Sequence, residues 1–469
     1  MTDFASLLVP DRGQKARAIH LVDKGSFVSW LKKRPAEDRA LLEAHRFDGK
    51  TPYAFAILPR GSEFEVVATV KVATVKNAED LSPWCLAALA EKLPEGLYKL
   101  ADGGPGIASL GWLLGQHRFD AYRSKPKDER GPRVLVTGEA AKIEEMLRLA
   151  EATVLVRDLV DTPAADLGPA ELEKAAADLA NRSGAQLRVT TGGELAEGYP
   201  LIAAVGAAAT LERAPRLIEL EWGKPEDPRI AIVGKGVCFD SGGLDLKQPS
   251  GMRIMKKDMG GAAHALALAG LVINARLPLR LHLLVAAVEN AVSGAAYRPG
   301  DVVKSRKGLF VEVDNTDAEG RLILADALAK AGEDNPDLIV DFATLTGAAR
   351  TALGPDLPAT FVNRDDLAAE LESAAREVDD PLWRLPLWEP YDEDLKSSIA
   401  DMSNTSGNAM AGAIYAALFL RRFVPEQIPW THLDTWAWRD PGKPGRPKGG
   451  DALGLRAVFA MLERRYSSP

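Results

Sequence analysis

Two carboxylates and a guanidinium gather in one short stretch, Asn315–Leu322, which reads Asn-Thr-Asp-Ala-Glu-Gly-Arg-Leu. The apolar run Leu309–Val313 precedes it and predicts a strand, and Leu322–Ala329 carries apolar residues at helical spacing. The charged groups therefore lie in a turn from a strand to a helix, the edge of an α/β sheet at which ligands bind. Taken alone, acidic residues in a first helical turn would be explained by their attraction to the helix dipole.

A second polar cluster lies upstream and changes that interpretation. Arg229–Gly234 predicts a buried strand, and Lys235–Lys247 predicts a Gly-rich loop after it. An Ala-rich helix is expected from about Met259 onward, directly after another acidic residue. If the two predicted strands are adjacent and parallel, their turns meet, and four carboxylates converge: Asp240, Asp258, Asp317 and Glu319. Carboxylates this close raise one another's pKa values unless cations compensate their charge. Divalent metal ions that share carboxylate ligands, as in two-metal hydrolases, usually provide that compensation.

These residues resemble the leucyl aminopeptidase (cytosol aminopeptidase) family of two-metal metallopeptidases. The stretch at 315–322 matches the family signature intact. The other metal-site motifs match with their spacing preserved, at Val233–Gly236, Phe239–Gly243, Lys247 and Lys257–Ala263. The strong resemblance runs from about residue 150 to the C-terminus, with only Gly111–Gly115 and Arg118–Asp120 as echoes before it. A signature with several spaced motifs is far more specific than a lone glycine pattern.

The resemblance implies a metal-dependent aminopeptidase that removes N-terminal residues from peptides at a dinuclear metal site with a bridging water or hydroxide. It implies two Mn²⁺ or Zn²⁺ ions per subunit, held by Lys235, Asp240, Asp258, Asp317 and Glu319. A lysine ligand must be neutral, and nearby dications would lower its pKa.

Two further catalytic groups follow from the same resemblance. Lys247 would stay protonated and stabilise the developing oxyanion. Arg321 would hold a bicarbonate ion that shuttles a proton, since its planar fork suits a carbonate-type anion. Taken singly, the lysines would be read as surface residues, and Arg321 would pair with a nearby acid; only the joint spacing favours catalysis.

The pocket for the substrate side chain departs from the family pattern. Met255, Thr344 and Gly347 match family pocket positions, whereas Trp436 stands where the family has a small residue. We therefore expect a pocket that Trp436 reshapes or covers, and a leucine preference does not follow from the resemblance. Asp161 replaces the usual Asn.

Composition limits the remaining possibilities. A net charge of −8 argues against a general binder of nucleic acids or anionic membranes. Two cysteines, Cys85 and Cys238, fit a reducing compartment and exclude a disulfide scaffold. The N-terminus lacks the pattern of a secretory signal, and Met259–Ala275 is short for a membrane span. We expect a cytoplasmic protein, and the resemblance suggests a homohexamer.

The alternation of strands and helices predicts two α/β domains. The expected division is a smaller domain over 1–150, a helical boundary region over 151–168, and a catalytic domain over 169–469. The larger domain should contain a mixed, largely parallel sheet with helices on both faces. Residues 439–448, rich in Pro, Gly and basic side chains, predict a loop.

Two alternatives remain at this point. One is an inactive relative kept as a scaffold or nucleic-acid-binding protein, against which the intact set of charged residues counts. The other is a two-metal phosphoesterase, which uses similar carboxylates but which the lysine ligand and the full signature disfavour. The six histidines match no zinc motif, and there is no Gly-x-Ser-x-Gly elbow.

Overall fold

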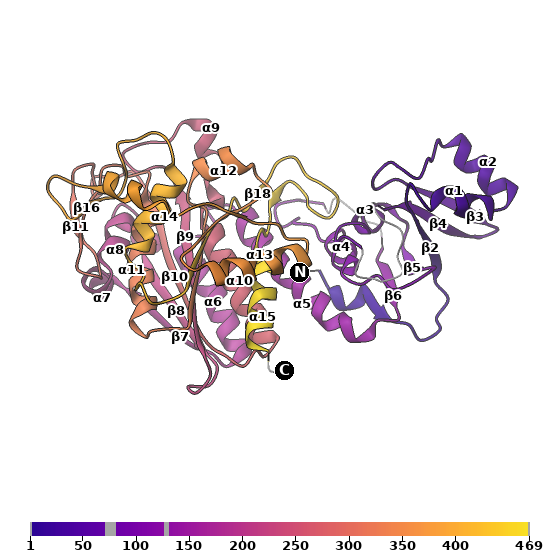
Figure 1. The fold of residues 1–469 in the computed structure, drawn as a ribbon, viewed down its shortest axis with the longest axis horizontal. Coiled ribbons are helices and arrows are strands. Elements are labelled where there is room, and N and C mark those ends of the chain that lie inside the picture. Colours follow the sequence, from indigo (N-terminus) through magenta and orange to yellow (C-terminus); the bar gives the residue numbers. More distant parts are fainter. Residues whose placement is uncertain (1, 71–80, 126–130, 468–469) are drawn as a thin grey trace. The chain divides into compact units, whose positions relative to one another are not determined.

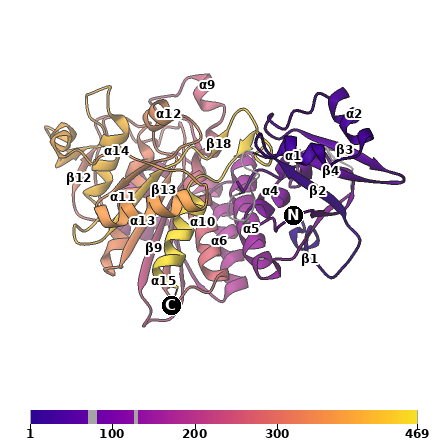
Figure 2. The same cartoon turned by 45° about the vertical axis from the view of Figure 1, so that its right-hand side comes forward.

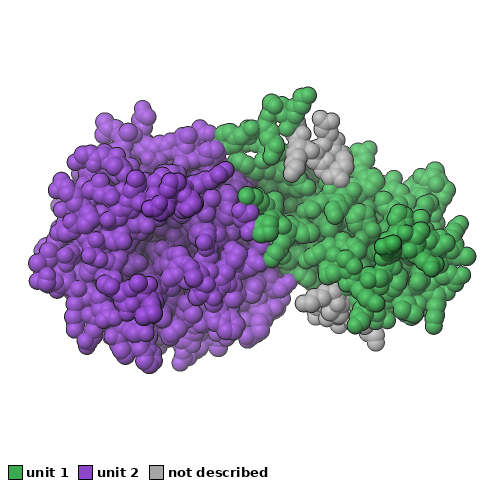
Figure 3. Space-filling model, turned by 90° about the horizontal axis from the view of Figure 1, so that it is seen from above, with its two compact units in different colours: residues 1–154, 441–448 green, residues 155–440, 449–469 purple. Residues whose placement is uncertain are grey.

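The structure is a computed structural model that describes residues 2–70, 81–125 and 131–467 (Figure 1). The chain divides into two compact units (Figure 3). Unit 1 contains Met1–Val154 and the segment Pro441–Lys448, and unit 2 contains Leu155–Asp440 and Gly449–Pro469. Helix α5 (Ile143–Asp161) runs through the division. No helix in the described residues has the length and apolarity needed to cross a membrane.

Unit 1 is built on a six-stranded sheet in the order β1-β6-β5-β2-β4-β3. Its strands are β1 (Leu8–Pro10), β2 (Arg17–Val22), β3 (Phe55–Arg60), β4 (Glu63–Thr69), β5 (Gly96–Leu100) and β6 (Arg133–Thr137). Its helices are α1 (Phe27–Lys32), α2 (Ala36–Ala44), α3 (Ala87–Lys92) and α4 (Ala108–Leu114). Helix α3 follows a turn over residues 83–86 that begins at Pro83.

Unit 2 contains an eight-stranded sheet in the order β15-β14-β17-β13-β9-β10-β8-β7. The strands are β7 (Gln186–Thr191), β8 (Arg216–Trp222), β9 (Arg229–Asp240), β10 (Arg280–Asn290), β13 (Leu338–Ala343), β14 (Ala359–Val362), β15 (Trp383–Arg384) and β17 (Trp430–Asp434). The central pairs β17–β13, β13–β9 and β9–β10 are parallel, and antiparallel pairs lie toward both edges. The predicted mixed, largely parallel sheet is confirmed.

Helices cover both faces of this sheet (Figure 1; Figure 2). One face packs against α6 (Pro169–Ser183) and α10 (Gly260–Asn274), with α15 (Leu455–Tyr466) against α10. The other packs against α8 (Pro200–Gly206) and α11 (Glu319–Glu333), with α14 (Gly412–Arg421) against α11. Successive side chains of β9 point to opposite faces of the sheet, as the two-residue period of a strand requires. Ala231, Val233 and Val237 join the core cluster that contains the apolar residues of α11.

Strand β9 extends further than the sequence pattern predicted. Lys235–Asp240 was expected to begin a Gly-rich loop, but it continues the strand, and Lys235 pairs with Ala286 of β10. Gly236 marks a close approach of two backbones and not a turn, since a Cβ there would lie 2.6 Å from the carbonyl oxygen of Ala286. Lys235 and Asp240 are therefore fixed on the most central part of the sheet.

The expected reason for the meeting of the two acidic clusters is also wrong. The strand before the signature, β12 (Phe310–Glu312), belongs to a separate small sheet with β11 (Val302–Lys304) and β16 (Met402–Ser403). It is not a neighbour of β9. The clusters meet because the first turn of α11 packs directly on β9. Gly320 permits this contact, because a Cβ there would lie 2.6 Å from Lys235 Cε.

The remaining elements of unit 2 are short. Three helical segments are α7 (Gly192–Gly198), α9 (Pro249–Met252) and α12 (Gly347–Leu353), and α13 (Asp365–Glu377) packs against α15. A 3-10 segment, η5 (Met255–Met259), leads into α10. The predicted loop at 439–448 lies between the two-residue strands β18 (Trp438–Arg439) and β19 (Gly449–Gly450).

Candidate active site

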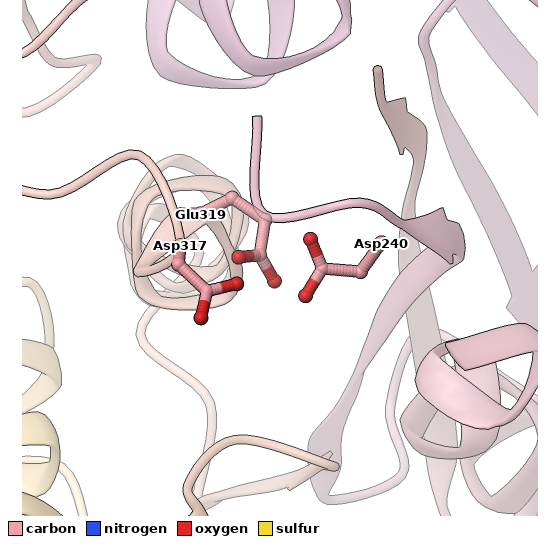
Figure 4. Close-up of side chains that lie close together, drawn as sticks. All are labelled: Asp240, Asp317 and Glu319. Carbon is pink, nitrogen blue, oxygen red and sulfur yellow. The ribbon is translucent and has the colours of Figure 1, made fainter. Parts of the chain in front are cut away.

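Three carboxylates point toward one another where β9 ends and α11 begins (Figure 4). Asp240 is the last residue of β9, Asp317 lies in the turn before α11, and Glu319 is the first residue of that helix. Each offers one oxygen, and these oxygens all lie within 4.8 Å of one another. Asp240 and Glu319 are buried, whereas the Asp317 side chain is 34% exposed. The site therefore has a closed interior and an open side at Asp317.

Lys235, on β9, contacts one of these carboxylates, Glu319, and also Asp258. Its ammonium is 2.6 Å from Asp258 Oδ2 and 2.9 Å from Glu319 Oε1, and it donates to the carbonyl oxygen of Thr344 at 3.0 Å. Burial by itself would lower the pKa of Lys235, but the negative charges of Asp258 and Glu319 outweigh burial and raise the pKa above its usual value. In the absence of other cations, Lys235 is protonated.

Lys247 closes the open side of the cluster. Its ammonium lies 2.7 Å from Asp240 Oδ2 and also contacts Asp317. Burial opposes the charged form here too, and Asp240 with its acidic neighbours again raises the pKa of Lys247. The two lysines thus each bridge two of the four predicted carboxylates.

Asp258 comes from the 3-10 segment η5 and is held on several sides. Thr344 Oγ1 donates to Asp258 Oδ1 at 2.9 Å, while Oδ2 faces Lys235. The ammonium of Lys257 lies 3.4 Å from Asp258 Oδ1. Burial would raise the pKa of Asp258, but Lys235 and Lys257 lower it. This carboxylate therefore stays ionised.

Glu319 and Asp317 hold their protons more strongly than isolated carboxylic acids do. Burial, together with the charge of Asp240, raises the pKa of Glu319 to about 8 and that of Asp317 to about 6. The cause is the one expected for carboxylates at short range, because each negative charge disfavours the next. The cluster therefore carries a deficit of positive charge that the two bridging lysines do not remove.

Arg321 is buried in the first turn of α11 and donates to the carbonyl oxygen of Asn404 at 2.6 Å. Its Nε has no hydrogen-bond partner among the described residues. Burial lowers the pKa of Arg321 to about 10, although Glu319 opposes this. A buried guanidinium with unused donors is a site for a small anion.

Several supporting residues were not identified from the sequence. Asn290, at the end of β10, donates through Nδ2 to Asp240 Oδ1 at 2.9 Å and to the carbonyl oxygen of Thr316 at 3.0 Å. Tyr297 donates to the same carbonyl at 2.6 Å. Asn290 and Tyr297 lie far from the motifs in sequence, so only the fold reveals their contribution.

Asn404 is a further residue that the sequence did not point to. Its Oδ1 accepts from the backbone N–H groups of Asp314, at 2.8 Å, and Asn315, at 3.2 Å, and its Nδ2 donates to the Asn315 carbonyl at 2.7 Å. One fully buried side chain therefore fixes the turn that carries Asp317, and its own carbonyl binds Arg321.

Two of the predicted pocket residues, Met255 and Thr344, are associated with Asp258. Met255 belongs to the same 3-10 segment, Thr344 bonds to the Asp258 carboxylate, and Gly347 begins α12. The ring of Trp436 contacts Lys257 and Arg350, with its centroid 4.1 Å from Lys257 Nζ and 4.2 Å from Arg350 Cζ. A cavity of only about 10 Å³ remains where Trp436 meets Arg350 and Thr346. That is room for about one water.

The donor set fits divalent metal ions. It combines carboxylate oxygens in close proximity with a buried oxygen, Glu319 Oε2, that has no hydrogen-bond partner among the described residues. Unsatisfied buried polar atoms are costly, and a cation would satisfy this one. Oxygen-rich ligation suits Mn²⁺ or Mg²⁺, and Zn²⁺ also accepts carboxylates.

Comparisons with known proteins give consistent results. A model of the cytosol aminopeptidase family, catalytic domain, matches residues 154–459, and a model of the M17 aminopeptidase N-terminal domain matches residues 18–131. A Roseiflexus castenholzii protein named "Probable cytosol aminopeptidase" is 37% identical over 465 residues, covering 91% of this chain and 93% of that protein. A Syntrophotalea carbinolica protein of the same name is 43% identical over 370 residues, covering 76% and 74%.

Solved structures of similar proteins match nearly the whole length of this chain. The crystal structure of the cytosol aminopeptidase from Coxiella burnetii matches with a TM-score of 0.91 and 44% identity, covering 98% of this chain and 99% of that one. The bottromycin maturation enzyme BotP in complex with Mn matches with a TM-score of 0.85 and 33% identity, covering 97% and 100%.

Proposed function

Since the chain belongs to the cytosol aminopeptidase family and is therefore a peptidase of the leucyl aminopeptidase type, we propose that it works through two divalent metal ions. The proposed ligands are Lys235, Asp240, Asp258, Asp317 and Glu319. The observation that carries the proposal is the convergence of three acidic oxygens within 4.8 Å beside a buried oxygen of Glu319 that lacks a partner. The Mn complex of BotP supports manganese as one of the metals.

The family resemblance implies the division of work among the ligands. Asp240 and Glu319 would be shared by the two ions. Asp317 would complete one ion's ligands, and Asp258 with Lys235 would complete the other's. When bound, the ions would supply Lewis acidity toward the peptide carbonyl and a water activated between them.

Lys235 has to lose its proton before it donates a lone pair. Its ammonium is held by Asp258 and Glu319 in the metal-free protein. A second positive charge at this place would remove the advantage of the protonated form. Lys235 would then release its proton and keep its position, because it is buried on β9.

Lys247 would act on the transition state. It lies at the open side of the cluster and reaches Asp240 and Asp317. Once those carboxylates bind metal ions, the protonated amine of Lys247 would be free to stabilise the oxyanion that forms when the peptide carbonyl is attacked.

Arg321 would hold a bicarbonate ion that moves a proton between nucleophile and leaving amine. The unused Nε of this buried guanidinium supports the assignment. Its attachment to Asn404 leaves part of the planar fork for a bidentate anion.

Substrates would be peptides with a free N-terminus, whose side chain enters a pocket formed by Met255, Thr344, Gly347 and Trp436. We further propose a cytoplasmic location, supported by the names of the relatives, and a homohexamer, supported by the family resemblance. Sedimentation as a monomer would contradict the hexamer.

A matched pair of peptides tests the proposed activity. The purified protein should hydrolyse a tripeptide with a free N-terminus and leave its N-acetylated form intact, because the free amine is part of recognition. A phosphate monoester should also remain intact. Cleavage of the acetylated peptide or of the ester alone would contradict the aminopeptidase assignment.

A further inference from the structure

Lys247 carries the amine that we assign to the oxyanion, and its side chain has different partners before and after metal binding. In the metal-free protein its ammonium is held by Asp240 and Asp317. Both carboxylates are proposed metal ligands, so bound ions would compete for them and weaken these two ion pairs. The position of Lys247 in the working enzyme then depends on the backbone of its own loop, residues 241–247.

Apolar packing contributes little to holding this loop. Leu244 and Leu246, on either side of Asp245, are 44% and 58% exposed. Residues 241–247 also belong to no helix or strand. Hydrogen bonds therefore have to fix the loop. One of them closes it on itself, since the backbone N–H of Lys247 donates to the carbonyl oxygen of Ser241 at 3.0 Å.

Asp245 ties the exposed part of the loop to the turn that carries Asp317. Its Oδ2 accepts from the backbone N–H of Thr316 at 2.7 Å and lies 3.1 Å from the Thr316 hydroxyl. In return, Thr316 Oγ1 accepts from the backbone N–H of Asp245 at 2.9 Å. The same hydroxyl donates to the carbonyl oxygen of Gly242, earlier in the loop, at 2.7 Å. Asp245 and Thr316 thus form a reciprocal clamp between two segments that are distant in sequence.

The Thr316 side of this clamp is firmly anchored. Thr316 is fully buried, and its carbonyl oxygen accepts from Asn290 Nδ2 at 3.0 Å and from the Tyr297 hydroxyl at 2.6 Å. Asn404 holds the backbone of the preceding residue, Asn315. None of these bonds uses a side chain of a proposed metal ligand. The anchor therefore does not depend on the ion pairs that metal binding would weaken.

We propose that Asp245 is a positioning residue for the reaction: through Thr316 it holds the loop of Lys247 where the amine can reach the oxyanion. The inference rests on the proposed aminopeptidase function and on the role assigned there to Lys247. Without the clamp, Lys247 keeps its charge but loses its fixed place, and misplacement by about 1 Å can lower a rate about 100-fold. Because the oxyanion forms only in the transition state, the loss should fall on kcat and leave KM nearly unchanged.

Hydrolysis of aminoacyl p-nitroanilides by the Mn²⁺-loaded enzyme tests the proposal. Asp245→Ala should lower kcat by about 10- to 100-fold, with the wild-type metal content by elemental analysis. Asp245→Asn should keep most of the rate, because its amide oxygen still accepts from the Thr316 N–H. Asp48→Ala is the matched control, since Asp48 accepts from the N–H and hydroxyl of Thr51 in the same way but lies in unit 1. Its kcat should equal that of the wild type.

A double variant separates positioning of the amine from general stability. In a Lys247→Ala background the amine is absent, so adding Asp245→Ala should cause little further loss of kcat, because residues that act through one another are not additive. Losses that multiply in the double variant would overturn the proposal. Loss of metal in Asp245→Ala, or equal losses in Asp245→Ala and Asp245→Asn, would overturn it as well.

Thr316 provides the same test if Asp245→Ala does not fold. Thr316→Val lacks the hydroxyl that binds the loop and should lose kcat, whereas Thr316→Ser should retain it. Equal kcat values for these two variants would overturn the clamp. A wild-type enzyme that cleaves no aminoacyl anilide would overturn the proposed function and this inference with it. Full activity of Asp245→Ala beside an active wild type would overturn this inference alone.

Discussion

The ammonium of Lys235 lies 2.6 Å from the carboxylate of Asp258, although the first is on strand β9 and the second is on the 3-10 segment before α10. Both residues are proposed ligands of the metal site. In the metal-bound protein both side chains would bind a metal ion, and the Lys235 ammonium would first have to lose its proton. Metal binding should therefore be linked to proton release.

Metal stabilisation should depend on pH. The pKa of Glu319 is about 8 and that of Asp317 about 6 in the metal-free protein, both above their ordinary values. Between the ordinary and the raised pKa, the folded state binds more protons than the unfolded state, so these groups make the metal-free protein less stable as pH rises. Metal ions replace those protons. The increase in Tm caused by Mn²⁺ should therefore be larger near pH 8 than near pH 6.

Calorimetric titration of Mn²⁺ in buffers of different ionisation enthalpy checks the same linkage. Protons should be released on binding, and more of them near pH 6 than near pH 8 for the two carboxylates. A pH-independent Tm increment together with zero proton release would contradict the assignment of Glu319 and Asp317 as ligands.

Lys247→Ala should lose rate and keep metal. Removing one donor to a developing oxyanion typically lowers kcat by about 10²- to 10³-fold. Elemental analysis should find the wild-type metal content, since Lys247 is not a proposed ligand. Lys396→Ala is a suitable control, because that lysine is 70% exposed and pairs only on the surface. Loss of metal in Lys247→Ala would refute the proposed role.

Asp317→Asn should weaken metal binding. Losing even an outer partner of a metal ligand typically costs about 10- to 100-fold in affinity, and losing a ligand should cost at least as much. Occupancy after dialysis against a metal buffer measures the effect. Asp365→Asn serves as the control, since its side chain is 92% exposed. Unchanged occupancy in Asp317→Asn would exclude Asp317 from the ligand set.

Asn404→Ala should reduce both stability and kcat. The substitution leaves the backbone groups of Asp314 and Asn315 without partners, at a cost of about 1–3 kcal/mol for each unsatisfied group. The turn that carries Asp317 should then lose its fixed position, and kcat should fall by more than tenfold, on the order expected for misplaced catalytic groups.

Asn363→Ala is the matched control for Asn404→Ala. Asn363 clamps backbone in the same way, since it donates to Ile428 O and accepts from the N–H of Trp430, but it lies away from the carboxylates. Its removal should lower Tm while kcat stays near the wild-type value. Equal losses of kcat in both variants would show that Asn404 acts through general stability alone.

Much of the fold could be predicted from the sequence. Apolar runs at 217–222, 281–288 and 338–342 predict strands with no competing pattern, and the structure contains β8, β10 and β13 at these places. The family resemblance indicated by the signature at 315–322 is confirmed by the matches along the chain. Local pattern succeeds here because burial and backbone pairing favour the same structure.

Prediction from the sequence failed where a residue's role depends on contacts with residues that are distant in the chain. The glycines within 235–247 suggested a loop, but Gly236 lies within a strand and allows close packing against β10. The acidic clusters meet through the packing of α11 on β9, and not through adjacent strands. In the sequence Lys257 was recognised only as part of a motif. Its contacts with Asp258 and Trp436 become evident only in the folded structure.

The central claim is that the carboxylate and lysine cluster holds metal ions that the reaction requires. The most direct measurement is hydrolysis of aminoacyl p-nitroanilides after complete chelation and again after Mn²⁺ or Zn²⁺ is restored. The account predicts that activity disappears with the metal and returns with it, in proportion to the metal bound. Full activity of the metal-free protein would contradict the claim, as would inactivity of protein with both ions bound.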